Sequence, residues 1–379
     1  MSLYLHIPFC HSKCAYCGFY SVANNSMRQD WLKAICTEIV TRKNELGEDY
    51  LHKTLYFGGG TPSMLNESEW RQIIDTLEDN YHISNSAERT LEANPEDITL
   101  ENCNLWLELG FNRLSIGVQS LNDKALRNSN RRHSAAEART AIESALKAGF
   151  RNIGVDFIIG LPDSEKSDIE LAAKLLNELP ITHVSLYILS IDEGSILYKR
   201  SLQGNFSPLS DDQEAELYKE YCQMIKSCGF DHYEISNFAK AGFQSQHNSA
   251  YWEQKPYIGF GAAAHSYDGS NIRRWNVANI KKYNEAWLMS EASPETAYEK
   301  ELLNSSDLYN ELIMTRLRTS NGIPLKILES TPFKEYWNSN RGALQKYIDR
   351  GAAKIENNSL ILTEEGWLIS DTIFTDLFY

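Results

Sequence analysis

The chain has 379 residues, of which 42% are hydrophobic, which is enough apolar material for one large domain and a smaller one. Its net charge of −14 opposes a nucleic-acid partner, because proteins that bind phosphate backbones use clustered Lys and Arg. No apolar run reaches the roughly 20 residues that cross a bilayer, and no secretory signal opens the chain. We therefore expect a cytoplasmic protein without a transmembrane segment.

The first two thirds of the chain alternate short apolar runs with longer segments of helical period, as in a parallel sheet crossed by helices. The expected strands are Leu3–Ile7, Thr54–Phe57, Arg89–Ala93, Arg113–Gly117, Ile153–Ile159 and His183–Leu189. Capping boxes predict that helices begin at Ser26, Asn66, Ser134 and Ser210. Six βα units are fewer than the eight of a closed barrel. The predicted fold class is therefore α/β, with a partial (β/α)6 TIM-type barrel over residues 1–232.

Two further segments follow this barrel. Residues 233–300 are rich in aromatic residues and glycine, and we interpret them as an irregular segment that covers the barrel mouth. From residue 301 two helical stretches precede a predicted hairpin, Ala353–Leu362, that turns at Asn357-Asn358 and leads to a helix capped by Thr363. This order is typical of a winged helix, so residues 301–379 are predicted to form a small C-terminal domain. The domain has no basic stripe for DNA, which favours a role in packing or protein contact.

Polar or glycine-rich segments follow most of the expected strands. They are Cys10–Cys17, Gly58–Pro62, Asn94-Pro95, Gln119 and Gly160–Pro162. Because the carboxyl ends of parallel strands meet at one edge, we expect these segments to converge on a binding site. A single loop of this kind could merely end its strand, and only their shared position favours a site.

Three cysteines, Cys10, Cys14 and Cys17, lie on the loop after the first expected strand. Three thiolates can hold three irons of a [4Fe–4S] cubane and leave the fourth iron open. The amine and carboxylate of S-adenosylmethionine (SAM) could chelate that iron. A zinc site would need a fourth ligand such as His11, and a redox dithiol of Cys14 and Cys17 would leave Cys10 unexplained. The cluster is the preferred interpretation, with zinc and redox sites as alternatives.

Motifs that agree with this interpretation are spread over nearly the whole chain. They are Tyr4–Cys10, the cysteine spacing, Gly58–Pro62, Glu92–Pro95, Gly117–Ser120, Asp156–Pro162 and Leu362–Gly366. Together they resemble the radical SAM family of oxygen-independent coproporphyrinogen III oxidase. The resemblance implies that SAM is surrounded by Tyr4, Tyr16, Gly60, Thr61, Glu92, Gln119, Arg131 and Asp156. The chemistry agrees, because carboxylates can accept from the amine or ribose hydroxyls and Arg131 can pair with the carboxylate.

Two departures from the oxidase branch concern the activity. That branch carries a further cysteine two places beyond the third cluster ligand, whereas Cys17 is followed here by Gly18-Phe19. It also carries an N-terminal extension before the first cluster ligand, which in this sequence is already Cys10. Both count against decarboxylation of coproporphyrinogen III, so whether the chain is an enzyme stays open. The chain is instead similar to the shorter heme-chaperone branch, as shown by Tyr233–Phe238, His247–Tyr251 and Gly261–Ser266. This similarity implies binding of heme or porphyrin and transfer of heme to respiratory proteins.

A His-Asn-x-x-Tyr motif, formed by His247, Asn248 and Tyr251, is associated with heme in that branch. A neutral His247 imidazole could ligate the iron while neighbouring aromatic side chains cover a porphyrin face. A histidine beside aromatic residues is also often a hydrogen-bonded structural residue, and His265 and His6 are competing ligands. The hypotheses are therefore a heme chaperone, a coproporphyrinogen oxidase and a zinc protein without radical chemistry.

Overall fold

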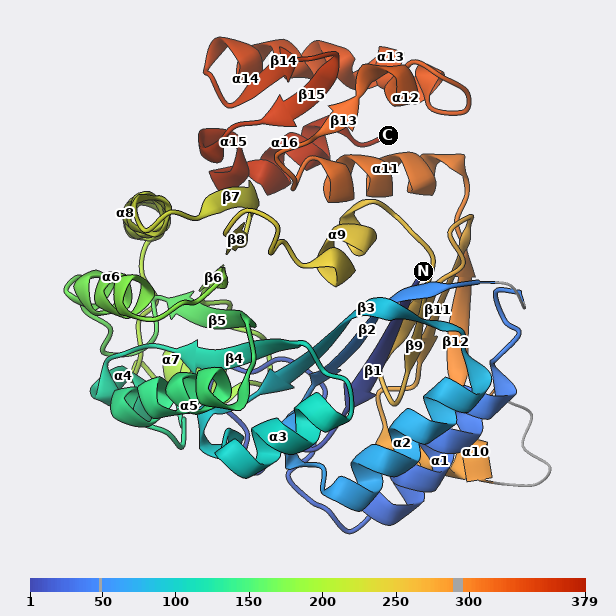
Figure 1. Ribbon diagram of the computed structural model, residues 1–379. Helices are drawn as coiled ribbons and strands as arrows, with labels where there is room; N and C mark the ends of the chain where they lie inside the picture. Colours follow the sequence, from blue (N-terminus) through green and yellow to red (C-terminus); the bar gives the residue numbers. More distant parts are fainter. Residues whose placement is uncertain (48–49, 289–295) are drawn as a thin grey trace.

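The fold is built around one curved sheet, seen in a computed structural model that describes residues 1–47, 50–288 and 296–379 (Figure 1). Six parallel strands form its centre in chain order. They are β1 (Ser2–Ile7), β2 (His52–Gly59), β3 (Ile83–Ala93), β4 (Arg113–Gln119), β5 (Asn152–Ile159) and β6 (His183–Ile188). All six predicted strands and the partial (β/α)6 barrel are confirmed.

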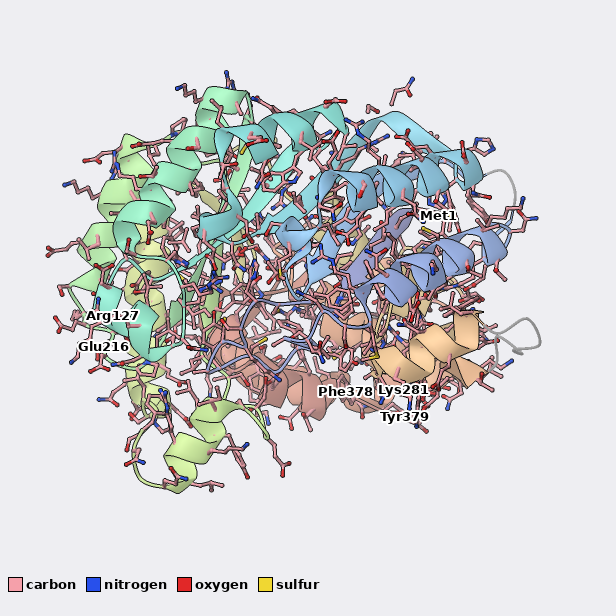
Figure 2. All side chains as sticks on the ribbon, turned by 90° about the horizontal axis from the view of Figure 1, so that it is seen from below. Met1, Arg127, Glu216, Lys281, Phe378 and Tyr379 are labelled. Atoms are coloured by element: carbon pink, nitrogen blue, oxygen red, sulfur yellow. The ribbon has the colours of Figure 1, made fainter. Side chains whose placement is uncertain are left out.

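Helices cover the outer face of this sheet (Figure 1). They are α1 (Arg28–Thr41), α2 (Glu67–Asn80), α3 (Leu100–Glu108), α5 (Ala135–Ala148), α6 (Asp168–Glu178) and α8 (Asp211–Ser227). Their inner sides pack on the sheet in one continuous apolar core. The short helices α4 (Asp123–Asn128) and α7 (Ile196–Leu202) lie beside the cysteine loop, where Ala15 donates its backbone N–H to Ser129 O and accepts from that of Leu197. Outer side chains of the helices project into solvent, as Arg127 and Glu216 do in Figure 2.

Three of the four predicted capping boxes are formed. Asn66, Ser134 and Ser210 each accept a hydrogen bond from the backbone three residues on, and the third residue's side chain accepts one in return. The prediction at Ser26 is wrong, because α1 begins after Met27 without a side-chain cap. The Ser26 backbone N–H instead donates to Asn24 Oδ1 at 2.8 Å, within the preceding loop.

The segment 233–300 is more regular than expected, and its interpretation as irregular loops over the mouth is wrong. It contains β8 (Asn237–Ala239), α9 (Gln246–Trp252), β9 (Tyr257–Phe260), β10 (His265–Tyr267), β11 (Ile272–Asn276), α10 (Ile280–Leu288) and the start of β12 (Tyr298–Leu302). β8 and β7 (Asp231–Glu234) extend the sheet beyond β6. β9 pairs with β1 in parallel, and antiparallel β10, β11 and β12 follow. The segment therefore widens the sheet at both edges.

The C-terminal residues form a separate small core. Its elements are α11 (Ser305–Arg316), β13 (Ile323–Pro324), α12 (Leu325–Leu328), α13 (Lys334–Asn340), α14 (Gln345–Asp349), β14 (Ala353–Glu356), β15 (Ser359–Leu362), α15 (Glu364–Leu368) and α16 (Ser370–Leu377). The predicted hairpin is confirmed, with Asn357 and Asn358 in the left-handed region at φ 49° and 58°. Thr363 caps α15 by accepting from the Gly366 backbone, as predicted. The domain packs on the side of the barrel that carries α9 (Figure 1).

Candidate functional site

A cavity of about 410 Å³ opens at the carboxyl ends of the central strands, within the size range of small-molecule sites. The loops after β1, β2, β3 and β4 and the ends of β5 and β6 all contribute to its wall. Ten of the predicted site residues line it: Cys10, Cys14, Cys17, Tyr16, Gly60, Thr61, Glu92, Gln119, Arg131 and Asp156. The cavity therefore lies at the carboxyl ends of the strands, where the sequence predicted a binding site.

The three cysteines lie on the loop that connects β1 to α1, and all three thiols are free. The Cys10 backbone N–H donates to Val22 O at 3.0 Å, and that of Cys17 donates to Cys14 O at 3.3 Å, so the loop folds back on itself. Burial raises the pKa of the Cys17 thiol, and the neighbouring Cys14 and Cys10 raise it further. The thiols are thus close enough to repel one another as anions, and a bound cation would relieve that repulsion.

Two side chains donate hydrogen bonds to these sulfurs. Thr61 Oγ1 lies 3.4 Å from Cys10 Sγ, and Arg131 Nη1 lies 3.4 Å from Cys14 Sγ. Such donors stabilise thiolates, which are the form that binds iron. Within the described ranges, no three His, Cys, Asp or Glu side chains are grouped as ligands of a single metal ion. A cubane makes a different demand, because each thiolate binds its own iron, and the donor set fits that demand.

The triple glycine, Gly58, Gly59 and Gly60, lies at the end of β2, and each residue makes room for a different group. A Cβ on Gly58 would lie 2.9 Å from the Glu92 carboxylate, and one on Gly59 would lie 2.6 Å from the His6 ring. A Cβ on Gly60 would lie 2.6 Å from Phe9 O and 3.1 Å from Cys10 Sγ. The absence of side chains therefore lets β2 end directly against the cysteine loop.

Asn94, which we did not predict as a site residue, connects two residues that we did. Its Nδ2 donates to Thr61 Oγ1 at 3.3 Å, and its Oδ1 accepts from Arg131 Nη2 at 2.7 Å. Arg131 Nη2 also donates to Gly117 O at 2.7 Å. The available signal was the Asn94-Pro95 pair directly after a strand. Asn94 therefore holds both side chains that reach the cysteine sulfurs.

Two carboxylates lie deeper in the cavity. Glu92 accepts from Tyr56 OH at 2.6 Å and from the Gly59 backbone N–H at 3.2 Å. Burial raises the pKa of Glu92 to about 7. Asp156 accepts from Ser115 Oγ at 3.3 Å, and burial also raises its pKa. These groups can accept hydrogen bonds from an amine or from hydroxyls.

The structure does not place Tyr4 on the cavity wall, in contrast to the prediction. Its hydroxyl lies 3.2 Å from His6 Nδ1, and its ring lies 6.0 Å from that of Tyr56 inside the barrel. Burial raises the pKa of the Tyr4 phenol well above its usual value. Tyr4 therefore points to the inside of the barrel, beside Tyr56 and His247, and not into the cavity.

The heme candidates lie at the opposite end of the barrel from the cysteines. His247 is 1% exposed, and its Nδ1 and Nε2 lie 2.8 Å from Thr54 Oγ1 and 2.9 Å from Tyr251 OH. Asn248 donates its backbone N–H to Ser245 Oγ at 3.2 Å. Burial lowers the pKa of His247 to about 3. Both ring nitrogens have partners, so ligation of iron by His247 would require one of these hydrogen bonds to break.

The comparisons with known proteins agree with this architecture. The Radical SAM superfamily matches residues 4–176, and the HemN C-terminal domain matches residues 303–369. The chain is 32% identical to the heme chaperone HemW of Bacillus subtilis over 98% of both chains. The chain belongs to the HemW family of radical SAM proteins. It is also 30% identical to HemW of Lactococcus lactis, over 98% of this chain and 96% of that protein.

Membership of the HemW family implies a [4Fe–4S] cluster and SAM. Coproporphyrinogen III oxidase (HemN) of Escherichia coli, described as a radical SAM enzyme, has the same fold with a TM-score of 0.84. That alignment covers 99% of this chain and 89% of HemN at 23% identity, which supports the fold alone. No helix in the described part of the chain is long and apolar enough to span a membrane.

Proposed function

We propose that this chain is a cytosolic heme chaperone that holds a [4Fe–4S] cluster and SAM in its cavity and passes heme to respiratory proteins. The observation that carries the proposal is the relationship to HemW over 98% of both chains, which includes the barrel and the C-terminal domain. The position two residues beyond Cys17 supports the chaperone over the oxidase, because it is Phe19, which has no thiol.

Different cavity residues would hold the cluster and SAM. Cys10, Cys14 and Cys17 would each bind one iron, while Thr61 and Arg131 donate to two of the sulfurs. A reduced cluster, when bound, can supply an electron to the sulfonium of SAM.

The remaining predicted residues would surround SAM itself. Glu92 and Asp156 would accept from its amine or its ribose hydroxyls, and Tyr16 would pack near the adenine. Gly60 and Gln119 lie on the same wall, Gln119 with φ of 65°.

An apolar rim on this cavity suits a porphyrin. Phe19, Tyr187 and Ile188 line the cavity, and 72%, 42% and 38% of their surfaces are exposed. Exposed aromatic and aliphatic side chains around an opening are typical of binding sites for flat apolar ligands. Lys13 and Arg132 lie on the same wall and can pair with propionates. We therefore propose that heme binds at this rim.

The test is an anaerobic hemin titration of the cluster-loaded protein, followed by transfer of the bound heme to an apo b-type cytochrome. Phe19→Ser and Tyr187→Ser should weaken hemin binding, whereas Leu202→Ser should not. Leu202 is a matched control because it is 73% exposed on α7 and does not line the cavity. Equal hemin binding by all variants would contradict the rim. Conversion of coproporphyrinogen III to protoporphyrinogen would contradict the chaperone and favour the oxidase.

A further inference from the structure

Helix α9 closes the end of the barrel that lies opposite the cysteine loop. The Glu88 carboxylate on β3 accepts the backbone N–H groups of Gln246 at 3.1 Å and His247 at 3.0 Å. The His247 ring then enters the barrel and bonds to Thr54 on β2, directly opposite Glu88 in the strand register. His247 is therefore fixed from both strands and from its own helix, where Tyr251 OH meets Nε2.

The next layer of the barrel interior connects His247 to the cavity. The His247 ring stacks on Tyr56 with centroids 4.8 Å apart and an angle of 27° between the planes. Tyr56 donates its hydroxyl to Glu92 Oε1 at 2.6 Å, and Glu92 lines the cavity. Tyr4 lies 6.0 Å from Tyr56 on the neighbouring strand and 6.3 Å from His247, which completes a cluster of three rings. One chain of contacts thus runs from α9 to the cavity.

We propose that His247 and Tyr251 are positioning residues that hold the Tyr56 ring and thereby orient Glu92 for SAM binding. The Glu92 carboxylate packs against Gly58, where a Cβ would lie 2.9 Å away, so its position there depends on hydrogen bonds rather than on a side chain at Gly58. The Tyr56 hydroxyl and the Gly59 backbone N–H donate those hydrogen bonds, and the His247 ring stacks against Tyr56 in turn. The inference rests on the SAM-binding part of the proposed function and is independent of the heme part, since it concerns only the SAM side of the cavity.

The test measures SAM affinity rather than turnover, by anaerobic equilibrium dialysis of the cluster-loaded protein. His247→Ala and Tyr56→Phe should each weaken SAM binding about tenfold, the effect of losing roughly one oriented hydrogen bond to a charged group. The double variant should be little worse than either single variant, because both act on one chain of contacts. His247→Phe should restore most of the affinity, since it keeps a ring against Tyr56 but offers no nitrogen to iron.

A pH profile separates positioning from a general loss of stability. The Tyr56 hydrogen bond lowers the pKa of Glu92, as Arg113 on β4 also does, whereas burial and the nearby Asp156 on β5 raise it. Tyr56→Phe should therefore move the pH at which SAM affinity is half-maximal upward. His52→Ala is the matched control, because His52 is a buried histidine that packs on Tyr81 at 5.3 Å and does not touch this chain of contacts.

Several results would overturn the proposal. One is a His247→Ala variant that loses hemin binding while its SAM affinity and pH profile stay unchanged, which would support iron ligation. Others are unchanged SAM affinity in Tyr56→Phe, fully additive effects in the double variant, or a wild-type protein that binds no SAM. Tyr56→Phe removes a single oxygen, so it keeps the test decisive if His247→Ala does not fold.

Discussion

Replacing Gly60 by alanine should prevent cluster assembly. An added Cβ would lie 2.6 Å from Phe9 O, 2.7 Å from Ile7 O and 3.1 Å from Cys10 Sγ. The neighbours cannot easily move, because the Gly60 backbone N–H donates to Ile7 O at 2.7 Å and that of Thr61 donates to Phe9 O at 2.7 Å. Overpacking of this kind costs about 1–3 kcal/mol, and here the displaced group includes an iron ligand.

The assay is iron and sulfide content after anaerobic reconstitution, together with thermal melting of the protein before reconstitution. Gly60→Ala should melt at a lower temperature and take up far fewer than the about four irons of a cubane. Gly342→Ala is the control, because no atom lies within 4 Å of its added Cβ. A Gly60→Ala protein that loads about four irons and melts like wild type would refute the reasoning.

Three further predictions concern stability. Glu69→Ala removes the carboxylate oxygen that lies 2.5 Å from the Arg28 guanidinium. Because this leaves a buried charge without its partner, the free energy of unfolding measured in urea should fall by about 3–5 kcal/mol. A loss of less than about 1 kcal/mol would show that the two side chains do not form a buried ion pair. Asn358 lies in the left-handed region at φ 58°, which Asn tolerates because its short polar side chain can hydrogen-bond locally. Asn358→Ala loses that side chain and should cost about 1 kcal/mol, whereas Asn358→Gly should not. Equal melting temperatures of the two variants would count against that turn. Burial raises the pKa of Glu92 from 4.5 to about 7, so the folded chain keeps a proton that the unfolded chain releases, and this group's contribution to stability falls as the pH rises through that window. Glu92→Gln should make the melting temperature depend less on pH between 4.5 and about 7, and an unchanged dependence would argue against the raised pKa.

The central strands could be predicted because their signals are local. Each combines a short apolar run with a polar or glycine-rich end, and a capping box is complete within four residues. The segment 233–300 was predicted wrongly because its strands have only three to five residues, and some of them pair with distant parts of the chain. β9, for example, pairs with β1. Strands this short give little periodic pattern, and neither sequence identifies the distant partner.

The cysteine loop and the triple glycine could be identified for the same reason, since each motif is contiguous. The position of Tyr4 could not be predicted from its motif. Its side chain and that of Glu92 both face the barrel interior, and only their depth along the strands decides which one reaches the cavity. Depth depends on the register between strands, and register follows from the assembled sheet. Asn94 was missed because its role lies in two hydrogen bonds to residues on other loops.

The role of a histidine depends on what its two nitrogens contact, and the contacts of His247 favour one of its two interpretations. To ligate iron, its ring would have to leave Thr54 or Tyr251 and lose its stacking on Tyr56. That one hydrogen bond is worth about 0.5–1.5 kcal/mol, which alone would lower the affinity of such a heme site by roughly 2- to 13-fold. The exposed rim at Phe19 carries no such cost, because its side chains already face solvent. On the proposed function, heme is therefore expected to bind at the cavity mouth, whereas ligation by His247 would require one of its two hydrogen bonds to break beforehand.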